Sequence, residues 1–114
     1  MTKRSDLFVH EERLSWETTG DGVQRKILGY DAGIMMVRVR FQKGSRGAVH
    51  SHPHRQVTLV EKGSFEVEID REKSTLKAGD SFFIPPDVKH GVLALEEGIL
   101  LDVFTPARED FLKA

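Results

Sequence analysis

The sequence predicts an all-β domain, a sandwich or barrel of short strands. Segments rich in Val, Ile, Phe and Leu recur roughly every ten residues between Gly, Pro, Asp and Ser, which is the spacing typical of such folds. Residues 65–70 (FEVEID) alternate apolar and charged side chains, and residues 35–41 do the same. This period of two indicates strands with one buried face and one solvated face.

The elements are expected to form a single domain over residues 1–114, because this length supports one modest core and not two. Residues 1–22 are predicted to be an N-terminal arm. Residues 106–112 predict one helical turn with proline at its start. Turns are expected between the apolar segments, at Gly44, Gly47, Gly63, Gly79, Gly98 and Pro85–Pro86.

The composition argues against several kinds of partner. The net charge is -1 and charges of both signs are interspersed, so no field of one sign indicates nucleic acid or an acidic membrane. The chain has no cysteine, which limits metal ligands to imidazole and oxygen. No apolar run has the length of a membrane span or resembles a signal peptide. We therefore expect a soluble, cytoplasmic protein that binds neither nucleic acid nor membranes.

Two predicted strands are apolar on both faces, residues 57–60 (VTLV) and residues 99–104 (ILLDVF). A lone small barrel buries only its interior, so the outer faces of these strands need a cover. The simplest cover is a second copy of the chain, which gives a homodimer packed sheet on sheet. The alternative cover is the N-terminal segment around Leu7, Phe8 and Leu14.

A histidine pair is the first sign of a metal site. His50 and His52 are two residues apart, so on a strand both imidazoles project to one face and can reach one ion at about 2.0–2.1 Å. Gln56 shares their parity, and its amide oxygen joins them if the chain bends near Pro53. A single His-X-His pair is also compatible with ordinary surface or core histidines.

A further ligand has to come from a different strand. His90 is the best candidate, because the rigid Pro85–Pro86 turn before it can direct its strand back across the barrel. His54 shares the parity of His50 but follows the bend, so whether it contacts a ligand stays open.

The spacing of these residues resembles the two motifs of the cupin family. The first motif has Gly, five residues, His-X-His, three or four residues, Glu, six residues and Gly. Residues 44–63 fit this pattern with glutamine in place of the glutamate, through Gly44, His50, His52, Gln56 and Gly63.

The second cupin motif has Gly, five residues, Pro-X-Gly, two residues, His, three residues and Asn. Residues 79–94 match it at Gly79, Pro85 and His90, with Asp87 and Ala94 in place of its Gly and Asn. The resemblance implies a jelly-roll β-barrel that holds one divalent metal ion through His50, His52, Gln56 and His90.

Glutamine in place of glutamate changes the expected chemistry of that ion. A neutral amide oxygen leaves the full divalent charge in place, which makes the ion a stronger Lewis acid. It also disfavours magnesium and calcium and favours nickel, zinc, iron(II), cobalt or copper. Since cupins at large use nickel, zinc, iron or manganese, the identity of the ion stays open.

A second group of candidate residues lies near the C-terminus. Asp102 and Phe104 are two apart in an apolar strand and project to one face, and a carboxylate inside a barrel is costly unless it has a function. Arg108 can pair with Asp102 or grip a substrate carboxylate through two hydrogen bonds. The alternative interpretation places Asp102 outside, in an interface salt bridge, with Arg108 as an ordinary tail charge.

Residues 102–112 (DVFTPAREDFL) resemble the C-terminal signature of the KdgF-type cupins of pectin and alginate breakdown. Residues 50–56 (HSHPHRQ) resemble the metal motif of that group, which commonly has Glu at the position of Arg55. This resemblance implies a metal-dependent enzyme that opens the ring of 4,5-unsaturated monouronates to give linear keto sugars. It also implies catalytic or substrate-holding roles for Asp102, Phe104 and Arg108.

Other functions remain compatible with the sequence, because one barrel hosts many chemistries. One is a metal-dependent dioxygenase, which three histidines and an open coordination position would also allow. Another is a non-catalytic sugar-binding cupin. The sequence does not separate pectin-derived from alginate-derived substrates, and it does not decide whether Arg55 affects substrate preference.

Overall fold

The structure, a computed structural model, describes residues 3–112, and these form ten strands and two short 3₁₀ helices. The helices are η1 (Glu11–Arg13) and η2 (Glu109–Leu112). The strands are β1 (Glu17–Gly20), β2 (Val23–Asp31), β3 (Ile34–Phe41), β4 (Arg46–His50), β5 (Arg55–Lys62), β6 (Ser64–Ile69), β7 (Glu72–Lys77), β8 (Ser81–Ile84), β9 (His90–Ala94) and β10 (Gly98–Thr105).

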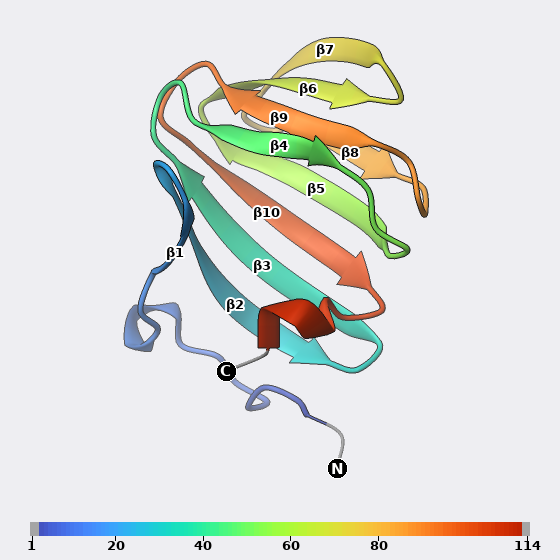
Figure 1. Cartoon of the computed structure of the whole chain (residues 1–114). Helices are drawn as coiled ribbons and strands as arrows, with labels where there is room; N and C mark the ends of the chain where they lie inside the picture. Colours follow the sequence, from blue (N-terminus) through green and yellow to red (C-terminus); the bar gives the residue numbers. More distant parts are fainter. Residues whose placement is uncertain (1–2, 113–114) are drawn as a thin grey trace.

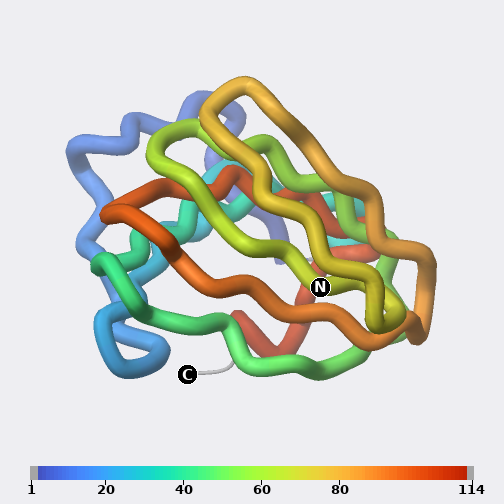
Figure 2. Tube along the Cα trace, turned by 90° about the horizontal axis from the view of Figure 1, so that it is seen from above, coloured from blue at the N-terminus to red at the C-terminus, as the bar shows by residue number. Residues whose placement is uncertain are grey.

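The strands build two antiparallel sheets that face each other. One sheet has the order β1-β2-β3-β10-β5-β8 and the other has the order β4-β9-β6-β7 (Figure 1). Neighbours in each sheet are often distant in sequence, as Figure 2 shows where β4 and β9, drawn in green and orange, run side by side. The predicted jelly-roll β-barrel is confirmed.

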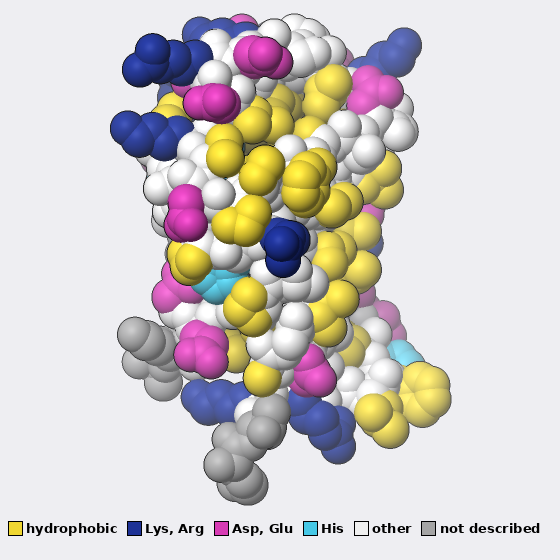
Figure 3. Space-filling view, turned by 90° about the vertical axis from the view of Figure 1, so that its right-hand side faces the viewer, with side chains coloured by type: hydrophobic (Ala, Val, Ile, Leu, Met, Phe, Trp, Pro, Cys, Tyr) yellow, Lys and Arg dark blue, Asp and Glu magenta, His cyan; other side chains and the backbone are white. Residues whose placement is uncertain are grey.

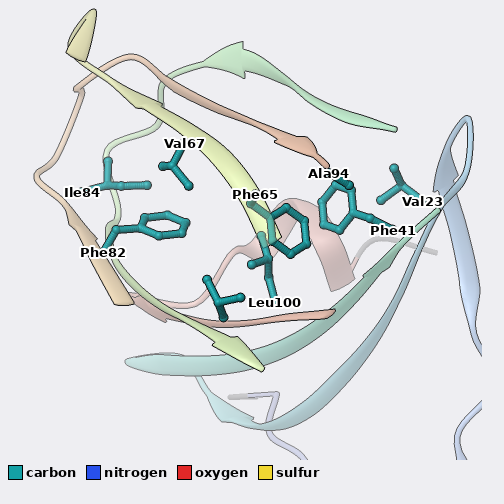
Figure 4. Packing of buried hydrophobic residues seen from close by; sticks show 9 residues of the cluster. Val23, Phe41, Phe65, Val67, Phe82, Ile84, Ala94 and Leu100 are labelled. Carbon is teal, nitrogen blue, oxygen red and sulfur yellow. The ribbon is translucent and has the colours of Figure 1, made fainter. Parts of the chain in front are cut away.

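Alternation of side chains along the strands creates the core. In β6, Phe65 and Val67 are buried, and in β3 Met35, Val37 and Phe41 are buried, as the period of two predicts. The main cluster fills the space between the two sheets (Figure 4), where the rings of Phe41 and Phe65 meet edge to face at 5.3 Å. Hydrophobic packing thereby fills the interior between the sheets.

Two turns show why the predicted motifs have glycine at residue 63 and tolerate aspartate at residue 87. Gly63 has a φ of 80°, and a Cβ atom there would lie 2.6 Å from the carbonyl oxygen of Glu97, so only glycine fits. Asp87 has a φ of 64° at the position where cupins usually have glycine. Aspartate tolerates this left-handed conformation better than most residues. The backbone N–H of Asp87 donates to the carbonyl oxygen of His52 at 2.8 Å, which ties this turn to the histidine loop.

The C-terminal turn begins later than the sequence predicts. The expected helical turn over residues 106–112 is the 3₁₀ helix η2, which starts at Glu109 rather than at the proline. The N–H of Ala107 donates to the carbonyl oxygen of Ala32. This bond holds residues 106–108, between β10 and η2, against the β2–β3 turn. Figure 1 shows η2, in red, in front of the lower ends of β2 and β3.

The outer face of the large sheet is only partly covered. The N-terminal segment lies over β2, where Glu11 pairs with Lys26 at 2.9 Å, but Leu7 and Phe8 are 84% and 82% exposed. The alternative cover is therefore wrong for Leu7 and Phe8, whereas its third residue, Leu14, is half-buried. Figure 3, which views the right-hand side of Figure 1, shows hydrophobic side chains gathered on the surface. On the large sheet, one outward row of residues in cross-strand register is exposed or half-buried: Met36, Val103, Val57 and Phe83.

Helices in the described part of the chain are short 3₁₀ turns, and none has the length and apolar character that crossing a membrane requires.

Candidate metal and substrate site

The four expected metal ligands come from three strands and one loop at the same end of the barrel. His50 ends β4 and His90 begins β9, and the two residues are cross-strand partners. His52 lies in the loop between β4 and β5, and Gln56 is the second residue of β5. The bend expected near Pro53 occurs, since residues 53–54 form a bend directly before β5.

The three histidines form a compact group. Their nearest ring nitrogens all lie within 4.8 Å of one another, which is a grouping that could hold one metal ion. The ring centroids of His50 and His90 are 4.5 Å apart, and those of His52 and His90 are 4.8 Å apart. His52 and His90 are buried, whereas His50 is exposed at the rim.

Backbone carbonyls fix the tautomer of each ring. Nδ1 of His50 donates to the carbonyl oxygen of Ala48 at 2.7 Å, and Nδ1 of His90 donates to that of Val88 at 2.9 Å. Nδ1 of His52 faces the carbonyl oxygen of His54 at 3.2 Å in the same way. A carbonyl oxygen only accepts, so each Nδ1 carries the proton and each Nε2 keeps a free lone pair.

The Gln56 amide provides the test of whether a metal ion fits. Its oxygen Oε1 lies 3.1 Å from Nε2 of His52, so two acceptors face each other once Nδ1 of that ring holds the proton. Burial, followed by the positive charge of Arg108, lowers the pKa of His52, so a second proton on the ring is disfavoured. A cation bound by both atoms removes the conflict, and this donor set of nitrogen and neutral oxygen suits a divalent transition metal.

Burial also lowers the pKa of His90, to about 4, so this imidazole is neutral at neutral pH. Neutral imidazole is the form that binds metal ions.

Asp102 faces into the barrel and joins a buried hydrogen-bond network. It is the cross-strand partner of Thr58, whose Oγ1 donates to Asp102 Oδ1 at 2.6 Å. Nε2 of Gln56 donates to Thr58 Oγ1 at 2.9 Å and also lies 3.4 Å from Asp102 Oδ1. Burial raises the pKa of Asp102 to about 6. The alternative with Asp102 outside the barrel, in an interface salt bridge, is therefore wrong.

Arg108 lies beside the same cavity but does not pair with Asp102. Its Nε and Nη2 donate to Asp110 at 3.1 and 3.0 Å, and its guanidinium carbon lies 4.3 Å from the ring centroid of Phe111 and 5.3 Å from that of Phe104. Of the two options for Arg108, the pairing with Asp102 is not formed, and Asp110, two residues along the chain, accepts from the guanidinium instead. A guanidinium has five N–H donors, so three remain for a ligand.

One cavity of about 130 Å³ connects these groups. Its polar lining comes from His50, Gln56, His90, Asp102 and Arg108. Its apolar lining comes from two aromatic rings and from residues of the hydrophobic core and its margin: Phe104, Phe111, Phe41, Val67, Phe82, Val92 and Leu100. A larger hollow of about 430 Å³, among Thr18, Gln24, Arg40 and Glu97, contains no histidine.

The sequence did not single out Thr58, Asp110 or Phe111. Thr58 had a readable signal, since it is the polar residue of an apolar strand and shares the parity of Gln56. Phe111 meets Phe104 edge to face at 5.7 Å. His54 does not join the histidine group, and its ring packs instead against the rings of His52 and Phe104 at 5.4 and 6.5 Å.

Comparisons with known proteins identify relatives of this chain. The family signature described as "Cupin domain" matches residues 37–104. The chain is 47% identical over 107 residues to "Pectin degradation protein KdgF" of Dickeya dadantii (strain 3937), which covers 92% of this chain and 96% of that protein.

Two solved structures have the same fold over nearly the whole chain. An RmlC-like cupin from Shewanella frigidimarina NCIMB 400 superposes with a TM-score of 0.93 at 45% identity, covering 95% of this chain and 97% of that one. KdgF from Halomonas sp. superposes with a TM-score of 0.90 at 37% identity, covering 94% and 99%. The chain therefore belongs to the cupin family and, within it, to the KdgF-like small cupins.

Proposed function

We propose that this protein is a metal-dependent enzyme that opens the ring of 4,5-unsaturated monouronates from pectin or alginate, giving linear keto-deoxyuronates. The observation that carries the proposal is that Asp102 lines the same small cavity as His50, Gln56 and His90. His52 joins this group through its ring nitrogen and its contact with Gln56. The similarity to proteins named KdgF, one of them described as a pectin degradation protein, supports the substrate class.

The metal would be one divalent transition ion, nickel, zinc, iron or manganese, held by His50, His52, Gln56 and His90. The inward lone pairs of the three rings and the inward oxygen of Gln56 support this ligand set. A bound ion supplies Lewis acidity that polarises a substrate oxygen.

Asp102 is the proposed acid and base. The C1 hydroxyl of the hemiacetal loses its proton to the carboxylate, a C1=O double bond forms, and the bond between C1 and the ring oxygen breaks. The electron pair of that bond stays on the ring oxygen, which becomes the enolate oxygen at C5. When the enolate takes a proton at C4, C5 becomes a ketone. The reaction is an isomerisation, and a carboxyl pKa of about 6 suits both proton transfers near neutral pH.

Arg108 and Phe104 are proposed to hold the substrate. The free donors of Arg108 suit the C6 carboxylate of a uronate, since a guanidinium binds carboxylates through paired hydrogen bonds. Asp110 and Phe111 hold the guanidinium in place before the substrate arrives. Phe104 offers an apolar wall for the sugar ring.

The proposal is tested with Asp102→Ala and Arg108→Ala variants that retain the parent's metal content. Ring opening is followed by the appearance of the linear product in proton NMR spectra. Both variants are expected to be strongly impaired. If both formed product as fast as the parent, the roles proposed for these residues would be wrong.

We also propose that residues 1–114 act as one cupin domain and that two copies form a homodimer. The predicted N-terminal arm, residues 1–22, includes residues 17–20, which pair with β2 as strand β1 of the large sheet. The outward row contains Val57 and Phe83, which are 50% and 52% exposed, in a position to pack against a second sheet. A twofold arrangement would bury this row on both copies.

A further inference from the structure

The side chain of Thr58 is polar where packing alone favours an apolar residue. Thr58 is 0% exposed, and Val60, the next inward residue of β5, is 1% exposed and part of the hydrophobic core. A buried hydroxyl is unfavourable unless it is hydrogen-bonded, and valine has the same shape without that requirement. The hydroxyl therefore needs an explanation beyond packing.

The hydroxyl connects the expected metal ligand Gln56 with the expected acid and base Asp102. Gln56 and Thr58 are two apart on β5, so they share a face, and Asp102 is directly opposite Thr58 on β10. The hydroxyl accepts from Nε2 of Gln56 at 2.9 Å and donates to Oδ1 of Asp102 at 2.6 Å.

The directions of these two bonds determine the orientation of the amide. A carboxylate only accepts, so Thr58 gives its single proton to Asp102 and keeps a lone pair for a donor. The NH₂ group of Gln56 is that donor, and the amide oxygen is therefore left on the opposite side. That oxygen lies 3.1 Å from Nε2 of His52, among the metal-binding histidines.

We propose that Thr58 is a positioning residue that holds the Gln56 oxygen toward the metal site and the Asp102 carboxylate at the cavity wall. Without the hydroxyl, the amide nitrogen keeps only its longer contact of 3.4 Å with Asp102 Oδ1, and the carboxylate loses its shortest hydrogen bond. The part that concerns catalysis rests on the proposed function, whereas the part that concerns metal binding does not.

The test compares Thr58→Val with Thr58→Ser. Titration calorimetry with Ni²⁺, and with Zn²⁺ in parallel, is expected to give a dissociation constant about 10- to 100-fold weaker for T58V, as is typical when a group that orients a ligand is lost. T58S keeps the hydroxyl and is expected to bind like the parent.

Turnover of the unsaturated uronate provides a second measurement on the same variants. Among the described residues, those that line the cavity include Gln56 and Asp102 but not Thr58. We therefore expect T58V to lower kcat by about 10- to 100-fold while KM stays close to that of the parent, and T58S to restore kcat.

Val60→Ala is the matched control, because it alters the same face of β5 one position deeper in the core. It is expected to lower the unfolding midpoint and to leave nickel affinity unchanged. Should T58V fail to fold, Thr58→Ala removes the same hydroxyl with no methyl group to accommodate and is compared with T58S instead.

Parental nickel affinity and kcat in T58V would overturn the proposal. Equal losses in T58S and T58V would also overturn it, because they would assign the effect to side-chain shape. If the parent bound metal but did not act on the uronate, the proposed function would fail, and the nickel titrations would still decide whether Thr58 orients Gln56. A parent that bound neither ion would overturn the metal-binding part.

Discussion

Replacing Asp102 with asparagine is expected to stabilise the metal-free protein and to remove its activity. Burial raises the pKa of this carboxyl from 3.8 to about 6. One pKa unit corresponds to about 1.4 kcal/mol, so the ionised carboxylate destabilises the folded state by about 3 kcal/mol at pH 8. Asparagine keeps an Oδ1 atom to accept from Thr58 and Gln56 and carries no charge. It cannot serve as a base, so we expect kcat to fall by about 10²- to 10⁴-fold.

The sign of the pH dependence distinguishes this explanation from improved packing. The carboxyl loses its proton near pH 3.8 in the unfolded chain and near pH 6 in the folded chain, so the parent becomes less stable as pH rises through this window. The stability gained by Asp102→Asn should therefore be about half as large at pH 5 as at pH 8. Urea unfolding of both proteins with a chelator present measures the difference at each pH.

Asp110→Asn is the matched control. The hydrogen bonds and charge of Arg108 lower the pKa of Asp110, so neutralising this carboxylate should bring no gain in stability. The reasoning is refuted if Asp102→Asn shows no gain at pH 8, or if its gain is the same at pH 5.

Three further predictions follow from the site and from the outer face of the sheet. Arg108→Lys should raise KM for the uronate about tenfold or more and change kcat less, because lysine cannot give paired hydrogen bonds to a carboxylate; steady-state kinetics that showed the reverse split would contradict this role. The rate should fall as pH drops below about 6, where Asp102 becomes protonated, and a pH profile flat to pH 5 would argue against a carboxylate base. Val57→Glu should convert the proposed dimer to a monomer in light-scattering chromatography, since it places a charge in the exposed apolar row, and a parent that is already monomeric would remove the dimer proposal.

The fold could be predicted from the sequence because the alternation of apolar and polar side chains along a strand is a local pattern. The alternation in residues 65–70 directly reports which side chains are buried, and β6 buries Phe65 and Val67 accordingly. The histidine pair is not local, because His50 and His90 become cross-strand partners only when the barrel closes. The spacing of the two cupin motifs nevertheless predicted that these histidines lie together.

What the sequence did not predict depends on register and on tertiary competition. The pairing of Asp102 with Thr58 requires the register between β5 and β10, which no local pattern specifies. The sequence did not decide whether Arg108 pairs with Asp102, and the structure pairs it with Asp110, two residues along the chain in η2. The N-terminal segment offered apolar residues as a cover, but Glu11 draws it to Lys26 on β2 and leaves Leu7 and Phe8 exposed.

The most direct test of the proposed function is the loss of ultraviolet absorbance of a 4,5-unsaturated monouronate. The decay is compared for metal-loaded protein, for protein treated with a chelator, and for a metal-loaded Asp102→Asn variant. We predict a fast loss with the metal-loaded parent and a loss near the spontaneous rate with the other two. If the metal-loaded parent, with one ion bound per chain, did not exceed the spontaneous rate, the assignment as a uronate ring-opening enzyme would be contradicted.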